Sequence, residues 1–232
     1  MKILGFPAGM FETNCYIVVG EDSRCVVIDP GQDAAPRVER IVEAEGLRPE
    51  AVLATHGHLD HVWNAREVAD RYGVPALIHP DDRYMLTDPG RGMSGSVTTM
   101  LEGQSFTEPA EVVEIFDGEE LDYAGLRFSV DHVPGHSEGS VSFTVTAEVE
   151  TGAPGGGGAG SAGELTVCFG GDVLFNGGIG RTDLPGGDHE VLLGSIAKKF
   201  LTRDDDVVVL PGHGPQTTIG QERAANPFLR GL

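Results

Sequence analysis

Four places in this 232-residue chain share one pattern, in which a short apolar run gives way to histidine or aspartate. The longest is Thr55-His-Gly-His-Leu-Asp-His61, which follows the apolar run Ala51–Ala54. The other three end in Gly135-His136, Gly171-Asp172 and Gly212-His213. Strand ends hold side chains rigidly, and glycine lets the backbone approach an ion closely. The pattern therefore favours a fold in which the ends of buried strands present these side chains to an ion.

The side chains at these four places are the kind that bind transition metals. Imidazole and carboxylate groups bind Zn²⁺ and its neighbours in the transition series. One catalytic metal needs three or four ligands, so the larger set indicates two divalent ions that generate and aim a hydroxide nucleophile. We expect zinc first, with iron or manganese as alternatives, because mixed histidine and aspartate ligation accepts all three. The set is His56, His58, Asp60, His61, His136, Asp172 and His213.

The composition limits the partners of the chain. The formal net charge is −20, whereas a nucleic-acid partner normally requires a basic face, so we expect no nucleic-acid partner. The amino terminus lacks a long apolar segment, and no run is long enough to span a membrane, so we expect no membrane partner and a cytoplasmic protein. Cys15, Cys25 and Cys168 lie in apolar stretches and are expected to be buried free thiols. The oligomeric state stays open.

Strands and helices alternate along the chain. We expect a helix at about 36–45, because Pro36 fits a first turn and Gly46 a stop, and a second helix at about 61–72. A third helix is expected at about 189–201, and Thr218 opens a short helix that ends before Pro227. The order predicts a sheet-centred α/β layering in one domain, 1–232. The expected strands are 15–19, 25–28, 51–54, 76–78, 126–130, 141–145, 166–169 and 207–210.

Two stretches break this alternation. Gly90–Phe106 has no clear period, and we expect a mobile segment over the site. Gly152–Gly163 consists almost entirely of small residues and proline, which is typical of a flexible tip between two strands of one hairpin.

The ordered motifs resemble those of the metallo-β-lactamase fold superfamily. Residues 55–61, 135–137, 171–172 and 212–214 match its motif order, and Asp29-Pro-Gly31 resembles its first motif. The resemblance covers nearly the whole chain. It implies an α/β (α+β) fold, a four-layer αβ/βα sandwich with a dinuclear site at the edge of its two sheets.

The same resemblance assigns a role to each candidate residue. It implies that three histidines hold the first metal and that Asp172 bridges to the second, with Asp60 and Asp172 in the catalytic centre. Asp29 would orient the first motif cluster through hydrogen bonds, although a plain turn aspartate is the alternative. The implied ligands are His56, His58 and His136 for the first metal, and Asp60, His61 and His213 for the second.

Two further segments resemble short, single-domain glyoxalase II-like proteins. They are Asp172–Asp183 and Thr217–Phe228. Glyoxalase II hydrolyses S-lactoylglutathione, so the resemblance implies a small-molecule thioester substrate. Arg181 would bind the carboxylate of the thiol carrier, or else it pairs with Asp183. The carrier stays open between glutathione and another small thiol, because the longer enzymes complete their glutathione site with a further helical domain.

Other reactions of this fold remain as alternatives. A persulfide dioxygenase shares the Gly-Arg-Thr-Asp pattern at Gly180–Asp183 and uses one iron, and a lactonase or other esterase would use the same two metals. Lactamases of the best-known subclass carry cysteine where Asp172 stands. A purely structural metal site is disfavoured, because such sites are closed by four ligands and are often rich in cysteine.

The shared role of Asp172 yields a direct test. Asp172→Ala should remove most of both metals, because a bridging carboxylate belongs to both sites. Elemental analysis should find about two divalent ions per chain in the wild type and far fewer in the variant. Two retained metals together with full activity in the variant would overturn the assignment.

Overall fold

The first half of the chain forms a six-stranded sheet, in a computed structural model that describes residues 1–94, 101, 103–150 and 162–232. The strands lie in sequence order across the sheet. The first three pair in antiparallel fashion, and the last four are parallel to one another. They are β1 (Lys2–Ala8), β2 (Thr13–Val19), β3 (Arg24–Ile28), β4 (Arg48–Leu53), β5 (Ala76–Ile78) and β6 (Val112–Glu114).

The second half forms another six-stranded sheet, in the order β14-β13-β10-β9-β8-β7. Its pairs are antiparallel except β10 with β13, which are parallel. Its strands are β7 (Glu120–Tyr123), β8 (Leu126–His132), β9 (Val141–Glu150), β10 (Ala162–Gly171), β13 (Val208–Pro211) and β14 (Thr217–Thr218). A small separate pair consists of β11 (Leu174–Phe175) and β12 (Gly178–Ile179).

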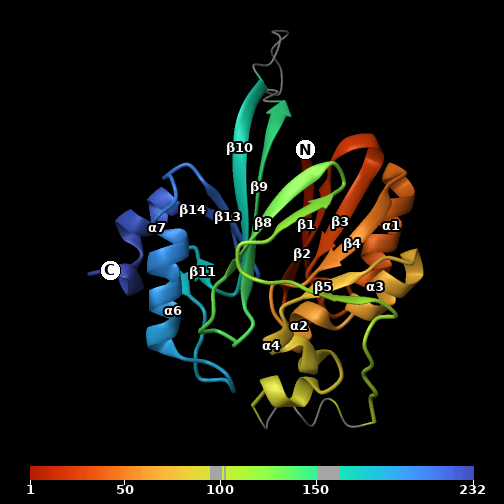
Figure 1. Ribbon diagram of the computed structural model, residues 1–232, viewed down its shortest axis with the longest axis horizontal. Coiled ribbons are helices and arrows are strands. Elements are labelled where there is room, and N and C mark those ends of the chain that lie inside the picture. Colours follow the sequence, from red (N-terminus) through yellow and green to blue (C-terminus); the bar gives the residue numbers. More distant parts are fainter. Residues whose placement is uncertain (95–100, 102, 151–161) are drawn as a thin grey trace.

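Helices lie on the outer face of each sheet, so the two sheets are the inner layers (Figure 1). This arrangement confirms the expected four-layer αβ/βα sandwich. In the first half the helices are α1 (Ala35–Glu45), α2 (Leu59–Val62), α3 (Ala65–Tyr72) and α4 (Pro80–Arg83). In the second half they are α6 (His189–Ser195), continued by a π-helical turn at Ile196–Phe200, and α7 (Ile219–Ala225). Short 3₁₀ turns occupy Glu21–Ser23, Tyr84–Leu86, Pro89–Gly92 and Pro227–Leu229.

The helix expected at 36–45 is confirmed as α1. Val38 and Val42 face the core, and the chain leaves the helix at Gly46, whose φ of 63° suits a residue without Cβ. The prediction of one helix at 61–72 is wrong. The structure has two helices there, α2 and α3, which are separated at Trp63 and Asn64. Asn64 has non-helical dihedral angles, and its side chain accepts a hydrogen bond from the Ala35 amide at the start of α1. That tertiary contact outweighs the local helical periodicity.

Sequence periodicity missed β1, β6 and β7, and also the two-residue strands β11, β12 and β14. Strand β1 is an edge strand that contains Gly5 and Pro7, both of which are unusual within strands. Strands β6 and β7 are only three and four residues long and also lie at sheet edges. Short edge strands bury little, so their apolar pattern is weak.

The two irregular stretches lie partly outside the described residues. Residues 151–161 of the predicted hairpin tip are outside them, but the flanking strands β9 and β10 do pair, with Glu150 opposite Ala162. Residues 95–100 and 102 of the segment at 90–106 are also outside them. The predicted mobility of that segment stays a prediction.

All three cysteines are buried and unpaired, as expected. None of the described helices is long and apolar enough to cross a membrane.

The sandwich is held together by an apolar layer between the two sheets. Phe128, Phe143 and Phe169 of the second sheet pack against Ile28 and Leu53 of the first, and all are at most 1% exposed. Two further clusters lie under the outer helices, one beneath α1 and α3 and the other beneath α6. Because the sheets contact each other through this layer, it fixes how their ends meet.

Removing one ring of that layer should destabilise the whole domain. Phe143→Ala should lower the free energy of unfolding by about 3–5 kcal/mol, because it deletes buried contacts and leaves a cavity. Phe228→Ala is the matched control, because Phe228 is 53% exposed. This substitution should change the free energy of unfolding by about 0.5 kcal/mol or less. Urea titration measures both. A similar effect of the two substitutions would contradict this account of the core.

Candidate metal centre

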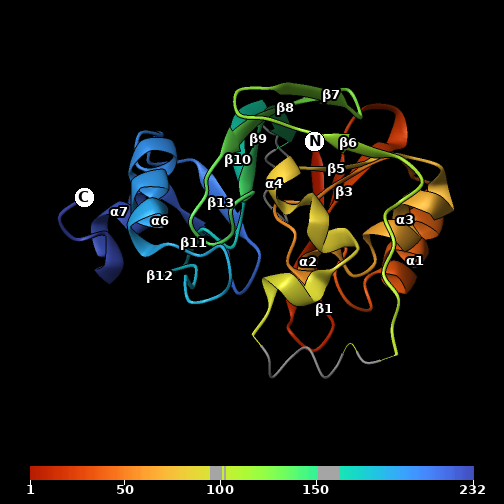
Figure 2. The same cartoon turned by 60° about the horizontal axis from the view of Figure 1, so that its bottom comes forward.

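The candidate residues meet where strand ends from both sheets come together. Four of them lie between β4 and α3, and the others follow β8, β10 and β13. Figure 2 shows α2 from the first half and β11 from the second half on the two sides of this edge. The structure brings together all seven side chains expected from the sequence, in overlapping groups of potential ligand atoms.

The first group consists of His56, His58 and His136, all buried. His58 Nδ1 lies 3.1 Å from His56 Nε2 and 2.9 Å from His136 Nε2. Metal–nitrogen bonds of about 2.0–2.1 Å place neighbouring ligand atoms roughly 3.3 Å apart. The three nitrogens are therefore spaced to hold one ion.

The second group consists of Asp60, His61 and His213. Asp60 Oδ2 lies 3.5 Å from His61 Nε2 and 3.2 Å from His213 Nε2. These spacings also fit the ligands of one ion.

Asp172 lies between the two groups. Its Oδ1 is 3.4 Å from His61 Nε2, and its Oδ2 is 3.7 Å from His136 Nε2 and 3.4 Å from His213 Nε2. His61 Nε2 and Asp172 Oδ1 are buried and make no hydrogen bond to any residue that the structure describes. Buried polar atoms without partners are costly, and a bound cation would satisfy both. The donor set therefore fits two divalent ions that share Asp172.

The two groups differ in their electrostatics. Burial, reinforced by neighbouring imidazoles, lowers the pKa of His56 and takes the pKa of His58 to about 3, which keeps both rings in the neutral form that binds metals. Burial opposes a charged ring at His61, but the nearby carboxylates outweigh it and raise the pKa of His61. Burial alone would raise the pKa of Asp60, but His61 and His213 hold it below its usual range.

Asp29 holds the cluster that follows β4. Its Oδ1 accepts a hydrogen bond from the Thr55 amide at 2.8 Å, and its Oδ2 accepts from the Thr55 hydroxyl at 2.7 Å. The same Oδ2 lies 2.9 Å from His61 Nδ1, which leaves His61 Nε2 facing the second group. A carboxylate behind a histidine fixes the tautomer and the orientation of its ring.

Other ligands are oriented in the same way. His136 Nδ1 lies 2.8 Å from the Arg181 carbonyl oxygen, and His213 Nδ1 lies 3.1 Å from that of Phe11. The Thr13 hydroxyl donates to Asp60 Oδ2 at 2.9 Å.

Asp82 is a supporting residue that sequence reasoning missed. It is fully buried, and it accepts hydrogen bonds from the Gly57 amide (2.8 Å), the Ser137 hydroxyl (2.7 Å) and the Gly139 amide (2.8 Å). It thereby ties the loop of His56 and His58 to the loop of His136. Asp82 lies shortly after the parallel strand β5. Because parallel strands end at one edge of a sheet, this position was the sequence signal that could have identified Asp82.

Glycine permits the close approach of the last loop. A Cβ on Gly212 would lie 2.1 Å from Asp172 Oδ1 and 2.6 Å from His61 Cε1. Such contacts are impossible, so only glycine fits beside the shared carboxylate.

Five of the candidate ligands line a cavity of about 200 Å³, namely His58, Asp60, His136, Asp172 and His213. Apart from the candidate ligands, its described lining is Phe11, Gly92, Met93, Ser94, Arg181 and Leu184. Arg181 makes a two-pronged ion pair with Asp183, through Nε and Nη2 at 2.7 Å each. The structure thus shows the pairing that was one of the two alternatives for this arginine, and it also places Arg181 at the cavity.

The remaining histidines lie outside this cavity. His79 caps α4 by accepting a hydrogen bond from the Asp81 amide, and its ring stacks on that of His132, with centroids 4.1 Å apart. These two histidines and Asp81 form one more group of potential ligand atoms within 4.8 Å of one another. His189 is exposed.

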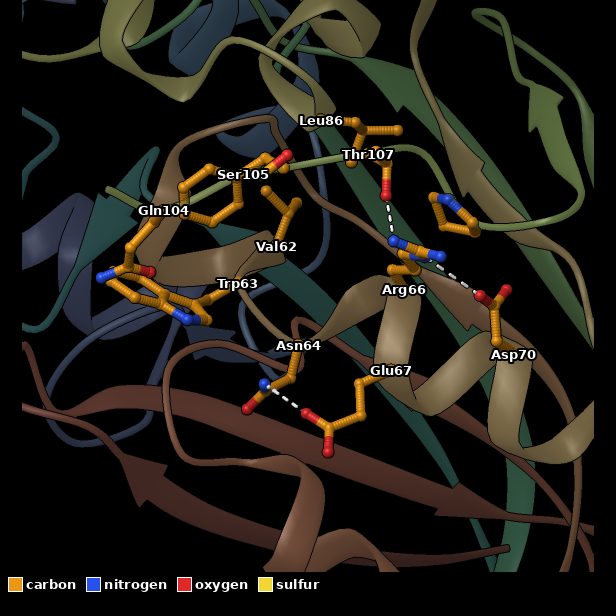
Figure 3. Close-up of a pocket in the computed structure, with 12 residues that line it drawn as sticks. Val62, Trp63, Asn64, Arg66, Glu67, Asp70, Leu86, Gln104, Ser105 and Thr107 are labelled. Atoms are coloured by element: carbon orange, nitrogen blue, oxygen red, sulfur yellow. Dashed lines mark hydrogen bonds and ion pairs between the residues drawn. The ribbon is translucent and has the colours of Figure 1, made fainter. Parts of the chain in front are cut away.

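Trp63 follows α2 and lies outside the core. It is half-buried and packs edge-on against Phe106, beside a second cavity (Figure 3). In that cavity Asn64 donates to Glu67, and Arg66 pairs with Asp70. None of the candidate ligands lines it.

Comparisons with known proteins agree with this geometry. The sequence model of the metallo-beta-lactamase superfamily matches residues 8–152 and 144–213. An uncharacterised protein of Mycobacterium tuberculosis is 46% identical over 100% of this chain and 99% of its own length. Hydroxyacylglutathione hydrolase GloC of Haemophilus influenzae is 35% identical over 99% of this chain and 98% of its own.

Two solved structures are similar over their full length. The BLEG-1 B3 metallo-beta-lactamase is 37% identical with a TM-score of 0.81, and the match covers 99% of this chain and 100% of that one. TTHA1623, solved in a di-iron-bound form, is 31% identical with a TM-score of 0.74, over 97% of this chain and 100% of that one.

The hydrogen bonds of Asp29 yield a prediction about metal affinity. Asp29→Asn should weaken metal binding about 10–100-fold, because an amide cannot accept every hydrogen bond from Thr55 and His61. Asparagine tolerates the φ of 49° at this position, so the backbone is preserved. Asp33→Asn is the matched control, since Asp33 is exposed and has a similar φ of 59°. Competition with a metal-binding dye measures both. Equal affinities would show that Asp29 is only a turn residue.

Proposed function

Because the chain belongs to the metallo-beta-lactamase superfamily, we propose that it is a dinuclear metal-dependent hydrolase of acyl thioesters, of the glyoxalase II type. The observation that carries the proposal is the position of Asp172 between two groups of three potential ligands. The similarity to a hydroxyacylglutathione hydrolase over nearly the full length supports the substrate class. The substrate would be S-lactoylglutathione or a related acyl thioester.

The geometry supports a metal-binding role for each candidate ligand. His56, His58 and His136 would hold one divalent ion, and Asp172 would belong to both. Asp60, His61 and His213 would hold the other. Two ions held in this way would supply a hydroxide nucleophile and would polarise the carbonyl that it attacks. Zinc is the first candidate, and the di-iron form of TTHA1623 supports iron as an alternative.

The lining of the cavity suits a thiolate leaving group. Beyond the proposed ligands, its described residues include no carboxyl or imidazole group that could donate a proton. A thiol has a pKa of about 8.5, so a thiolate leaves without a dedicated general acid. An amine leaving group needs a proton, which favours a thioester over an amide.

β-Lactam hydrolysis is a second candidate, because BLEG-1 is similar over the full length of both chains. Its leaving group is a nitrogen, and the described lining of the same cavity offers no separate acid to protonate it. The persulfide dioxygenase alternative would use one iron and leave part of the ligand set unbound.

A panel of substrates separates these functions. Metal-loaded protein should hydrolyse lactoyl thioesters, with little turnover of the chromogenic lactam nitrocefin and no oxygen uptake with glutathione persulfide. His213→Ala should lower kcat/KM at least about 100-fold, because it removes a proposed ligand of the second ion. His189→Ala is the matched control, since His189 is exposed, and it should match the wild type. Oxygen uptake or lactam turnover without thioesterase activity would refute the proposal.

A further inference from the structure

The two segments that resemble glyoxalase II-like proteins are joined to each other in the structure. The first, Asp172–Asp183, contains the hairpin of β11 and β12, and the second, Thr217–Phe228, contains α7. The second segment supplies no proposed metal ligand, and none of its residues belongs to the described lining of the cavity. Its hydrogen bonds to the hairpin indicate what it does.

Glu222 of α7 is a buried carboxylate that is held by three neutral donors. Its Oε1 accepts a hydrogen bond from the Thr217 hydroxyl at 2.5 Å. Its Oε2 accepts from the Gly177 amide at 2.9 Å and from Asn226 Nδ2 at 2.7 Å. A carboxylate accepts all of these bonds at once, which makes its burial tolerable. Because Gly177 lies in the turn between β11 and β12, one of the bonds fastens the hairpin to α7.

Asn226 makes a second connection to the same turn. Its Nδ2 donates to the Gly178 carbonyl oxygen at 3.0 Å as well as to Glu222, and its Oδ1 accepts from the Phe228 amide at 3.0 Å. Asn226 is only 3% exposed, and both polar atoms of its amide have partners within the protein. Glu222 and Asn226 together, called the hairpin anchor below, therefore hold consecutive residues of the hairpin.

The anchored hairpin begins and ends at the proposed metal centre. It follows Asp172, and the Arg181 carbonyl oxygen after it lies 2.8 Å from His136 Nδ1. Its two ends are packed closely, since the Gly180 amide donates to the Val173 carbonyl oxygen at 3.1 Å and a Cβ on Gly180 would overlap the Asp172 carbonyl oxygen. A shift of the hairpin would therefore displace the oxygen that orients His136.

We propose that Glu222 and Asn226 are positioning residues of the metal centre, which hold the Arg181 carbonyl oxygen against His136 Nδ1 by anchoring the hairpin. That hydrogen bond keeps the proton of His136 on Nδ1 and leaves Nε2 for the first ion. The inference rests on the metal centre of the proposed function, but it does not depend on which substrate is hydrolysed.

Two nearly isosteric substitutions break the anchor with opposite changes of charge. Glu222→Gln removes a negative charge and an acceptor, whereas Asn226→Asp adds a negative charge and removes both donated hydrogen bonds. Each should weaken the binding of one of two zinc ions about 10-fold, because His136 is a ligand of one ion only. A general effect of charge would instead move the affinity in opposite directions in the two variants. Stepwise competition with a metal-binding dye measures both affinities.

Asn176→Asp is the matched control. Asn176 Nδ2 also fastens the hairpin, by donating to the Gln216 carbonyl oxygen at 3.2 Å, but Asn176 is exposed. The substitution adds the same charge as Asn226→Asp at a site where solvent screens it, so both zinc affinities should stay at the wild-type values.

Proton exchange provides a readout that a loss of stability alone would not change. In zinc-saturated protein labelled with ¹⁵N-histidine, nuclear magnetic resonance should show faster solvent exchange of the His136 Nδ1 proton in both variants. The His213 Nδ1 proton, which faces the Phe11 carbonyl oxygen, should exchange as in the wild type. Thr217→Val removes one of the three bonds to Glu222 and should give a smaller change in the same direction, even if the other variants do not fold.

The outcomes separate the anchor from the proposed function. A wild type that binds fewer than two zinc ions would refute the metal centre itself. Two bound ions with unchanged affinities and unchanged exchange at His136 in the variants would refute the anchor and leave the proposed function intact. Affinities that move in opposite directions in Glu222→Gln and Asn226→Asp would likewise refute the anchor, because they would show an effect of charge alone.

Discussion

The contact on which the structure depends is the position of one carboxylate, Asp172, between two groups of three potential ligands. Its oxygens lie 3.4–3.7 Å from imidazole nitrogens of both groups. Each group combines residues that follow β4 in the first half of the chain with one histidine of the second half, so Asp172 can join the groups only if the two sheets meet edge to edge at the correct height. The apolar layer around Phe128, Phe143 and Phe169 sets that height. The geometry of the candidate metal site therefore depends on the packing of the core.

Buried carboxylates outside the ligand set make the arrangement rigid. Asp29 orders the loop after β4, and Asp82 joins that loop to the one that carries His136. Each accepts several hydrogen bonds, which is how a buried carboxylate becomes tolerable in a protein interior. The ligand atoms are thus held close to one another by groups that do not themselves reach the cavity. Such preorganisation is what a hydroxide-based hydrolase requires.

Much of this was predictable from sequence, because metal ligands at strand ends leave a local signature in the chain. The fold, helix α1 and the gathering of the ligand set needed only short-range patterns and a resemblance. The interruption at Asn64 was not predictable, because its cause is a hydrogen bond to Ala35 in another helix. The role of Asp82 was missed for the same reason, since its partners lie 25 to 57 residues away. The state of Arg181 also depends on side-chain geometry, although its partner is two residues along the chain.

The most direct test of the central claim is anomalous X-ray diffraction from crystals of the metal-loaded protein. The account predicts two anomalous peaks about 3.5–4 Å apart. The carboxylate of Asp172 should contact both metal ions, through one oxygen or through both. One peak alone, or two peaks with Asp172 bound to neither or to only one, would contradict it.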